Sequence, residues 1–245
     1  MSFYRSIADY YDLIFPLEKS QVDFVKSCMD EPYPGRTVLD VGSGTGNLAI
    51  ALSQAGFTVA AIDSDPEMLR KAEGKLKPGT VVTFALMDMR EMSARFTASS
   101  FDAILCFGNT LVHLDGPREV EDFCAHSRDM LRGGGGLLLQ ILNYDHILDH
   151  RVSDLPLIEN DAIRFIRHYE YDPKTKTILF KTRLAVKGAF KEIDNEIPLY
   201  PLRRGELETA LRKSGFTDIT FYGGFDKREL KADSLPLVVR ALKQV

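Results

Sequence analysis

The fold is decided by a single stretch, VLDVGSGTGN over residues 38–47. Apolar residues run into three glycines, Gly42, Gly44 and Gly46, and a helix-forming segment follows. Glycine permits positive φ angles and a close backbone approach to a ligand, and a helix N-terminus offers N–H groups without partners. The stretch therefore predicts a strand, a glycine-rich turn and a helix, with nucleotide binding as one interpretation of the turn.

The spacing of these glycines indicates which classes of nucleotide-binding turn the segment can form. A dinucleotide-binding turn has G-x-G-x-x-G, whereas Asn47 gives the spacing G-x-G-x-G here. A P-loop is excluded because no Lys-Ser/Thr pair follows the glycines. An NAD-dependent dehydrogenase therefore fits this turn poorly.

Outward from the turn, short apolar runs alternate with mixed segments up to about residue 142. We expect strands over residues 37–41, 58–62, 81–86, 101–107 and 137–142, and helices over residues 46–54, 66–76 and 118–131. Asp65 is the expected N-cap of the second helix, with Pro66 at its first position. The glycine run over residues 133–136 predicts the turn into the fifth strand. Apolar strands separated by helices form a parallel sheet covered on both faces, so this part is a doubly wound α/β unit.

The pattern changes after residue 150. Segments 162–170 and 178–186 alternate between apolar and polar residues across a proline-containing turn, which predicts half-exposed antiparallel strands. A helix over residues 205–214 ending at Gly215, and strands over residues 217–222 and 235–242, complete the chain. We expect the antiparallel insertion to lie over the carboxyl edge of the sheet, where ligands bind in open α/β folds.

Two carboxylates follow consecutive strands of the expected sheet. Asp63 lies about 20 residues after the glycine turn, where an acidic side chain suits two ribose hydroxyls. Asp88 lies between Met87 and Met89, which suits an adenine amino group with thioethers on the ring faces. The glycine turn and the two carboxylates together predict a nucleoside site at one edge of the sheet.

These residues resemble the pattern of class I S-adenosylmethionine-dependent methyltransferases, and the resemblance extends over nearly the whole chain. It implies a Rossmann-like, mostly parallel seven-stranded sheet that ends in an antiparallel hairpin, and S-adenosyl-L-methionine as the cofactor. It divides the chain into a cofactor-binding core (residues 1–149), a β insertion that acts as a substrate lid (150–202) and the completion of the core (203–245). The residues that it places around the cofactor are Tyr10, Gly42, Ser43, Gly44, Thr45, Gly46, Asp63, Ser64, Met68, Met87, Asp88, Met89 and Phe107.

Two further stretches resemble glycine N-methyltransferases. CFGNTLVHL over residues 106–114 is similar to their G-N-S-x-x-H-L stretch, and LNYDHIL over residues 142–148 resembles R-N-Y-D-x-I-L. The resemblance implies that Asn109 faces the methyl donor and the substrate. The arginine that clamps the carboxylate of glycine falls at Leu142, so this chain lacks that bidentate guanidinium and glycine is disfavoured as substrate.

Three residues, Asn109, His113 and Tyr11, are the candidates for catalysis. The methyl donor is already activated, so the protein supplies alignment and needs neither a metal nor a nucleophilic side chain. His113 is the candidate base for an amine acceptor, with a local hydrogen-bonding role as the alternative. Tyr10 and Tyr11 resemble an N-terminal aromatic segment that closes over the donor, with core packing as the alternative for each.

Composition excludes other classes. The 245 residues carry 31 basic and 35 acidic side chains, a net charge of −4 that argues against a nucleic-acid partner. No apolar run reaches the roughly 20 residues that span a bilayer, and no secretory leader is evident, so we expect no membrane partner and a cytoplasmic location. Cys28, Cys106 and Cys124 lack C-x-x-C spacing, and His146 and His150 lack a third ligand, so no disulfide framework or metal site is expected.

The sequence thus predicts an enzyme that methylates a small molecule at an amine nitrogen by direct in-line transfer. Leu142 keeps an O-methyltransferase or an amino-sugar N-methyltransferase open as alternatives. A non-catalytic S-adenosylmethionine-binding protein is the alternative from another class, although simple binding needs neither the Asn109 stretch nor the lid. The expected partner is a small-molecule methyl acceptor, and assembly into a homo-oligomer is left open.

Overall fold

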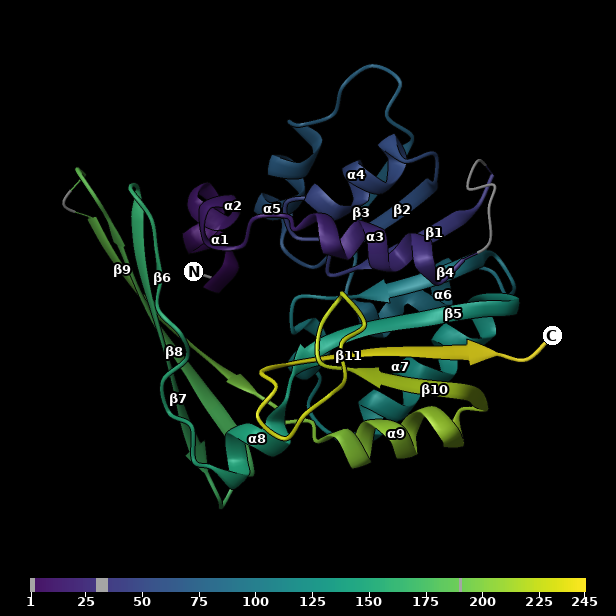
Figure 1. Cartoon of the computed structure of the whole chain (residues 1–245). Helices are drawn as coiled ribbons and strands as arrows, with labels where there is room; N and C mark the ends of the chain where they lie inside the picture. The colour runs from purple at the N-terminus through teal and green to yellow at the C-terminus, as the bar shows by residue number, and fades with distance from the viewer. Residues whose placement is uncertain (1–2, 30–34, 190) are drawn as a thin grey trace.

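The computed structural model describes residues 3–29, 35–189 and 191–245. A seven-stranded sheet forms the core, in the order β10-β11-β5-β4-β1-β2-β3 (Figure 1). Its strands are β1 (Thr37–Val41), β2 (Thr58–Asp63), β3 (Val82–Leu86), β4 (Phe101–Cys106), β5 (Leu131–Leu142), β10 (Phe216–Tyr222) and β11 (Pro236–Lys243). Strands β1 to β5 are parallel to one another, and β11 is antiparallel to both β5 and β10. The doubly wound sheet with a terminal antiparallel hairpin, predicted from the sequence, is confirmed.

Helices cover both faces of this sheet. On one face, α3 (Lys19–Ser27) and α4 (Asn47–Gln54) pack over apolar residues of β1, β2 and β4. On the other face lie α6 (Met92–Arg95), α7 (Pro117–Met130) and α9 (Arg204–Lys213). Neighbouring residues of one strand point to opposite faces, so β1 contributes Val38 to the first layer and Leu39 to the second. Burial on both faces explains why the strands are apolar throughout.

The predicted helix ends are largely confirmed. The side chain of Asp65 accepts hydrogen bonds from the backbone N–H groups of Glu67 at 2.9 Å and Met68 at 3.4 Å, and α5 (Pro66–Glu73) begins at Pro66. Gly215 follows α9 with φ +85°, the left-handed conformation expected after a helix.

One prediction in this region is wrong. The glycine run over residues 133–136 lies inside β5, which begins at Leu131, and is not a turn before it. The pairing with β4 shifts from Phe101–Leu131 to Ala103–Gly136, so the run makes an irregularity in the strand. A Cβ atom at Gly135 would lie 3.0 Å from the carbonyl oxygen of Asp102. Glycine allows this close backbone approach.

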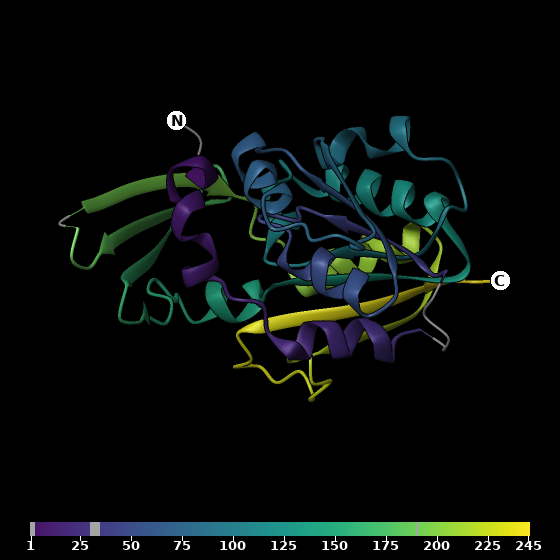
Figure 2. The same cartoon turned by 90° about the horizontal axis from the view of Figure 1, so that it is seen from above.

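A second, antiparallel sheet, which we call the lid sheet, consists of β6 (Ile158–Glu159), β7 (Ile163–Asp172), β8 (Thr177–Val186) and β9 (Lys191–Leu199). The sequence predicted β7 and β8 and missed the other two strands. Both views place α1 (Phe3–Ile7) and α2 (Tyr11–Ile14) between the lid sheet and the core (Figure 1 and Figure 2). One apolar cluster joins these helices to the lid sheet through Phe3, Ile7, Ile14, Ile163, Phe165 and Leu184. The division of the chain at residues 149 and 202 stays a prediction.

Candidate functional site

Two adjoining cavities lie where the strands of the core sheet end. The larger compartment has a volume of about 740 Å³ and the smaller one about 260 Å³. Tyr4, Tyr11, Gly42, Gly108 and His113 line both of them, so the two compartments meet at these residues. Two ligands can therefore lie next to each other in the site.

The smaller compartment collects the side chains predicted at the ends of β2 and β3. Its lining includes Asp63, Ser64, Met68, Met87, Asp88 and Met89. Of these, Met68 is almost fully buried, whereas the carboxylate of Asp88 is partly exposed. The compartment thus offers carboxylate oxygens for hydroxyl and amino groups and thioethers for a flat ring.

The glycine turn lies where the two compartments meet. Gly42 has φ +71°, and a Cβ atom there would lie 2.4 Å from Cγ2 of Thr110. Gly44 has φ +55° and faces the ring of Tyr11, 3.2 Å from the position of its missing Cβ atom. Gly46 lies outside both linings, and its Cβ position is 2.6 Å from the ring of Phe84. The first two glycines line the site. The third, Gly46, allows the start of α4 to pack closely against the ring of Phe84.

The two hydroxyl residues of the turn differ in their contacts. Thr45 is buried and donates a hydrogen bond to the carboxylate of Asp12. Oγ of Ser43 is buried and has no partner among the described residues. Both residues line the larger compartment. An unpaired buried hydroxyl in a glycine cradle suits a polar ligand group.

Asp63 fixes the shape of the turn. One of its oxygens accepts a hydrogen bond from the N–H of Gly44 at 2.7 Å, and the other accepts from the N–H of Asp65 at 2.9 Å. Burial raises the pKa of Asp63, and these two hydrogen bonds oppose that shift. The carboxylate is therefore already held by backbone N–H groups beside the space where a ribose would lie.

Asp88 is held by an arginine. Both of its oxygens accept hydrogen bonds from Arg90, which also forms ion pairs with Asp115 and Glu119. The backbone N–H of Arg90 donates to the same carboxylate at 2.9 Å. An adenine amino group would therefore share Asp88 with a guanidinium.

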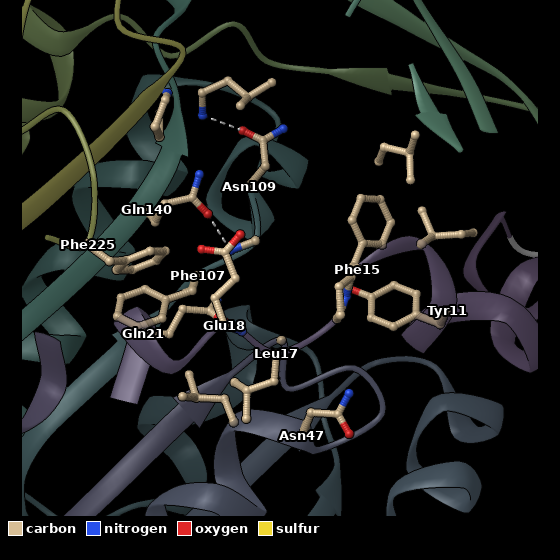
Figure 3. A pocket seen from close by; sticks show the side chains of 18 of the residues that line it. Tyr11, Phe15, Leu17, Glu18, Gln21, Asn47, Phe107, Asn109, Gln140 and Phe225 are labelled. Atoms are coloured by element: carbon tan, nitrogen blue, oxygen red, sulfur yellow. Dashed lines mark hydrogen bonds between the residues drawn. The ribbon is translucent and has the colours of Figure 1, made fainter. Parts of the chain in front are cut away.

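Asn109 lies at the start of η3 (Thr110–His113), with φ +65°. Its Oδ1 accepts a hydrogen bond from the N–H of Leu142 at 2.9 Å, and its Nδ2 donates to the hydroxyl of Tyr144 at 3.0 Å. Figure 3 shows its amide in the lining of the larger compartment, with the bond to residue 142 dashed. Asn109 therefore ties η3 to the end of β5 within the site.

His113 contacts a tyrosine that the sequence did not single out. The Nε2 atom of His113 lies 2.7 Å from the hydroxyl of Tyr4. Burial, with a contribution from Arg90, lowers the pKa of His113 to about 4, so the imidazole is neutral at neutral pH. Burial and the nearby Tyr11 and Asp63 raise the pKa of Tyr4. A neutral hydrogen-bonded pair thus stands where the compartments meet.

The two predicted tyrosines separate in the structure. Tyr11 begins α2 and lines both compartments. Tyr10 lies outside both linings, and the ammonium group of Lys191 is 5.4 Å from its ring centroid. Consecutive helical residues point about 100° apart, so the two rings face different surroundings. The structure thus brings Tyr11, but not Tyr10, together with the other predicted residues in the linings.

Several residues of the larger compartment were not anticipated. Burial and the nearby Asp63 raise the pKa of Asp40 to about 7. Oε1 of Gln140 accepts a hydrogen bond from the N–H of Gly108 at 2.8 Å. Figure 3 shows the predicted Phe107 together with unpredicted side chains of the wall, namely Phe15, Leu17, Glu18, Gln21, Asn47 and Phe225. Arg167 and Tyr169 of the lid sheet complete that wall.

Across the described ranges, no three His, Cys, Asp or Glu side chains gather as metal ligands. The rings of His146 and His150 lie 4.8 Å apart, centroid to centroid. Among the helices in the described part of the chain, none has the length and apolar character to cross a bilayer.

Comparisons with known proteins agree with this geometry. Residues 38–135 match the family model of a methyltransferase domain. A glycine/sarcosine N-methyltransferase of Aphanothece halophytica is 29% identical over 207 residues, which cover 83% of this chain and 74% of the relative.

Two solved structures are similar in fold. The CcbJ methyltransferase of Streptomyces caelestis has a TM-score of 0.82 at 22% identity and covers 100% of this chain and 99% of its own. An amino pentose methyltransferase of Micromonospora echinaspora with S-adenosylmethionine bound has a TM-score of 0.69 at 18% identity, covering 98% of this chain and 92% of its own. Both likenesses extend through the core sheet and the lid sheet.

Proposed function

Because the chain belongs to the class I S-adenosylmethionine-dependent methyltransferases, we propose that it methylates a small molecule at an amine nitrogen. The observation that carries this proposal is the meeting of two compartments at Tyr4, Tyr11 and His113. The smaller one has the chemistry for a nucleoside, and the larger one has room for an acceptor. Alignment of two bound reactants is the main contribution that such a reaction requires.

The residues around the glycine turn fit the cofactor. Asp63 would bind the ribose hydroxyls, and Met68 and Met87 would pack against the adenine. The unpaired hydroxyl of Ser43 and the ring of Tyr11 would lie toward the methionine part. When bound, S-adenosyl-L-methionine supplies an electrophilic methyl group on a sulfonium, a cation that aromatic rings attract.

The chemistry of His113 favours nitrogen over oxygen as the acceptor atom. With its pKa lowered to about 4, this imidazole is a weak base. A hydroxyl acceptor needs a base to remove its proton, whereas an amine can lose its proton to water before it binds. Burial in a cavity walled by aromatic rings also lowers the pKa of an amine, because the charged form is desolvated. The relative that acts on glycine and sarcosine supports the same acceptor atom.

Leu142 bears on which amine is used. Its side chain lines the larger compartment at the position where the glycine-type pattern has arginine. An apolar side chain there removes a carboxylate anchor from β5. This supports an acceptor other than glycine.

The test is methyl transfer from methyl-labelled S-adenosylmethionine to three separate pools: small metabolites, total RNA and denatured protein. We expect label in the metabolite pool, in an N-methylated product identified by mass spectrometry. The variant Asp63→Ala is the control, since it should weaken donor binding and reduce label in every pool. Label in an O-methylated product, or only in RNA or protein, would contradict the proposed acceptor. Donor binding by calorimetry without transfer to any pool would support a non-catalytic binding protein instead.

A further inference from the structure

The inner face of the lid sheet carries a charged residue in an apolar row. Residues of β7 that are two apart share a face, and this face holds Ile163, Phe165, Arg167 and Tyr169. The other three are buried, and Arg167 itself lies in the lining of the larger compartment. The pattern of the strand therefore directs a guanidinium toward the proposed acceptor.

Arg167 has no acidic partner among the residues that the structure describes. One terminal nitrogen donates a hydrogen bond to the carbonyl of Pro156 at 2.7 Å, which holds the side chain in place. Its Nε is buried and has no hydrogen-bond partner within the described ranges. Burial lowers the pKa of this guanidinium, and only Tyr169 opposes the shift. The fold thus holds a half-buried guanidinium, with its Nε buried and unpaired and with no acidic side chain bonded to it among the described residues.

A second unsatisfied group lies directly across the sheet. Thr182 of β8 pairs with Arg167, so the two side chains share the inner face. Its hydroxyl is also buried and without a partner in the described part of the chain. The next residue in this row, Asn195 of β9, donates to the hydroxyl of Ser6 at 2.8 Å. At one end of the row, Arg167 lines the larger compartment; next to it Thr182 lies outside that lining with its hydroxyl unpaired, and at the other end Asn195 is paired with Ser6 of α1.

Arg228, which also lines the larger compartment, differs from Arg167 in having an acidic partner. Arg228 forms an ion pair with Asp226 at 3.3 Å and donates to the carbonyl of Gly223 at 2.9 Å. Arg167 has no such ion pair, and a buried N–H donor without a partner, such as its Nε, lowers the stability of a folded protein. The presence of Arg167 in the cavity wall is explained if a ligand supplies a negatively charged group that accepts its hydrogen bonds.

We propose that Arg167 binds a carboxylate of the methyl acceptor, so that the acceptor is an amine bearing a carboxylate held against the lid sheet. The planar guanidinium fork matches a carboxylate with two parallel hydrogen bonds. The identity of the acceptor as an amine rests on the proposed function, whereas the carboxylate site does not. In this proposal the carboxylate is bound by Arg167 of β7, in the lid sheet, and not from the end of β5, where the residue is Leu142.

The test measures binding, so that it is independent of catalysis. Butanoate and 4-phenylbutanoate, which contain no amine, are titrated by calorimetry into the full chain saturated with S-adenosylhomocysteine. The variants are Arg167→Gln, Arg167→Lys and a matched control, Arg164→Gln, on the exposed outer face of the same strand. We expect Arg167→Gln to weaken carboxylate binding by about 10- to 100-fold, the range for hydrogen bonds to a charged group. Arg167→Lys should lose less, and Arg164→Gln should match the parent chain.

Unchanged binding of S-adenosylhomocysteine to Arg167→Gln shows that this variant is folded. The proposal is overturned if neither carboxylate binds, if Arg167→Gln binds both as well as the parent does, or if the variant loses S-adenosylhomocysteine instead. Tighter binding of butylphosphonate than of butanoate would overturn the assignment to a carboxylate. Carboxylate binding at Arg167 in a chain that methylates no amine would refute the proposed amine acceptor and leave this site standing.

Discussion

The two compartments of the site are built in different ways. The smaller one takes its predicted side chains from the ends of β2 and β3 and from the turn after β1, all close in sequence. The larger one depends on contacts between more distant segments, such as Asn109 with Tyr144, and the wall that both compartments share joins Tyr4 to His113. The segment from β1 to β3 thus brings together the predicted side chains of the smaller compartment, the proposed donor side, whereas the larger compartment, the proposed acceptor side, is assembled from segments far apart in the sequence.

Their charged groups differ in the same way. Asp63 of the smaller compartment is held by two backbone N–H groups before any ligand binds. Arg167 of the larger compartment has no acidic partner among the described residues. Both oxygens of Asp63 are therefore hydrogen-bonded within the protein, whereas the Nε of Arg167 is not.

The largest effect that we expect is on the free energy of unfolding at acidic pH, and it comes from His113, which lines both compartments. The pKa of His113 is about 4 in the fold against an ordinary 6.5, so between these values the unfolded chain binds a proton that the folded chain does not. Stability contributed by the neutral ring is complete above pH 6.5 and falls as the pH drops toward 4, by roughly 3 kcal/mol in all.

Urea unfolding of the parent chain and of His113→Gln, at several pH values from 4 to 7, measures this effect. Buried carboxylates with raised pKa values, such as Asp63, change stability in the opposite direction, so the difference between the two chains is the quantity to compare. The glutamine variant should lose less stability in acid than the parent does. The control His150→Gln alters an exposed ring and should follow the parent. Parallel curves for the parent and His113→Gln would refute the burial of a neutral imidazole.

The donor side is tested by Asp63→Ala. We expect the dissociation constant for S-adenosylmethionine to rise about 10- to 100-fold, because hydrogen bonds to a charged group are lost. The comparison is Asp88→Ala, which should have a smaller effect because the carboxylate of Asp88 is partly exposed to water and is ion-paired with Arg90. Calorimetry measures both constants. An equal or larger loss for Asp88→Ala would reverse this ranking of the two carboxylates.

The acceptor side is tested by Asn109→Ala. This change removes the link between η3 and the end of β5, so kcat should fall about tenfold while the donor dissociation constant changes less than twofold. Tyr144→Phe, which removes one of the two hydrogen bonds, should fall between the parent and Asn109→Ala. If donor binding and turnover decline together, Asn109 belongs to the donor side instead.

The donor side was accessible from the sequence because its signals are local. The spacing from Gly42 to Asp63 and Asp88 follows from strands that end at one edge of a parallel sheet. The parallel, doubly wound character of the core followed from the alternation of apolar runs with helical segments, whereas the antiparallel terminal hairpin was implied by the resemblance to methyltransferases. The glycine run over residues 133–136 misled because glycine serves both turns and irregular strands.

The acceptor side was only partly accessible because its contacts are tertiary. No periodicity indicates that Tyr4 reaches His113, 109 positions away. Strand β9 was missed because Asn195 interrupts its inward row and because Pro198, on the exposed row, disfavours a strand. Arg167 did carry a signal, since it occupies an inward position between Phe165 and Tyr169. The sequence signal for the proposed carboxylate site is thus a charged residue in an otherwise apolar row of β7.

The smallest effect that we expect is on the melting temperature, and it tests whether Arg167 lowers stability in the absence of a ligand. Replacing a buried charge by an apolar side chain of similar length often stabilises a protein. We expect Arg167→Met to raise the melting temperature of the acceptor-free protein by a few degrees, corresponding to about 1 kcal/mol for a chain of this size. Arg164→Met, on the exposed face of the same strand, should leave the melting temperature within 1 °C of the parent, roughly the limit for surface changes.

The same substitution should weaken the binding of carboxylates, so stability and binding change in opposite directions at this one position. Differential scanning calorimetry with and without 4-phenylbutanoate measures both. The carboxylate should raise the melting temperature of the parent chain and not that of Arg167→Met, because only the parent has a cation to pair with it. A lower melting temperature for Arg167→Met without ligand would mean that the bond to Pro156 outweighs the unpaired charge, and that Arg167 is there for the lid sheet itself.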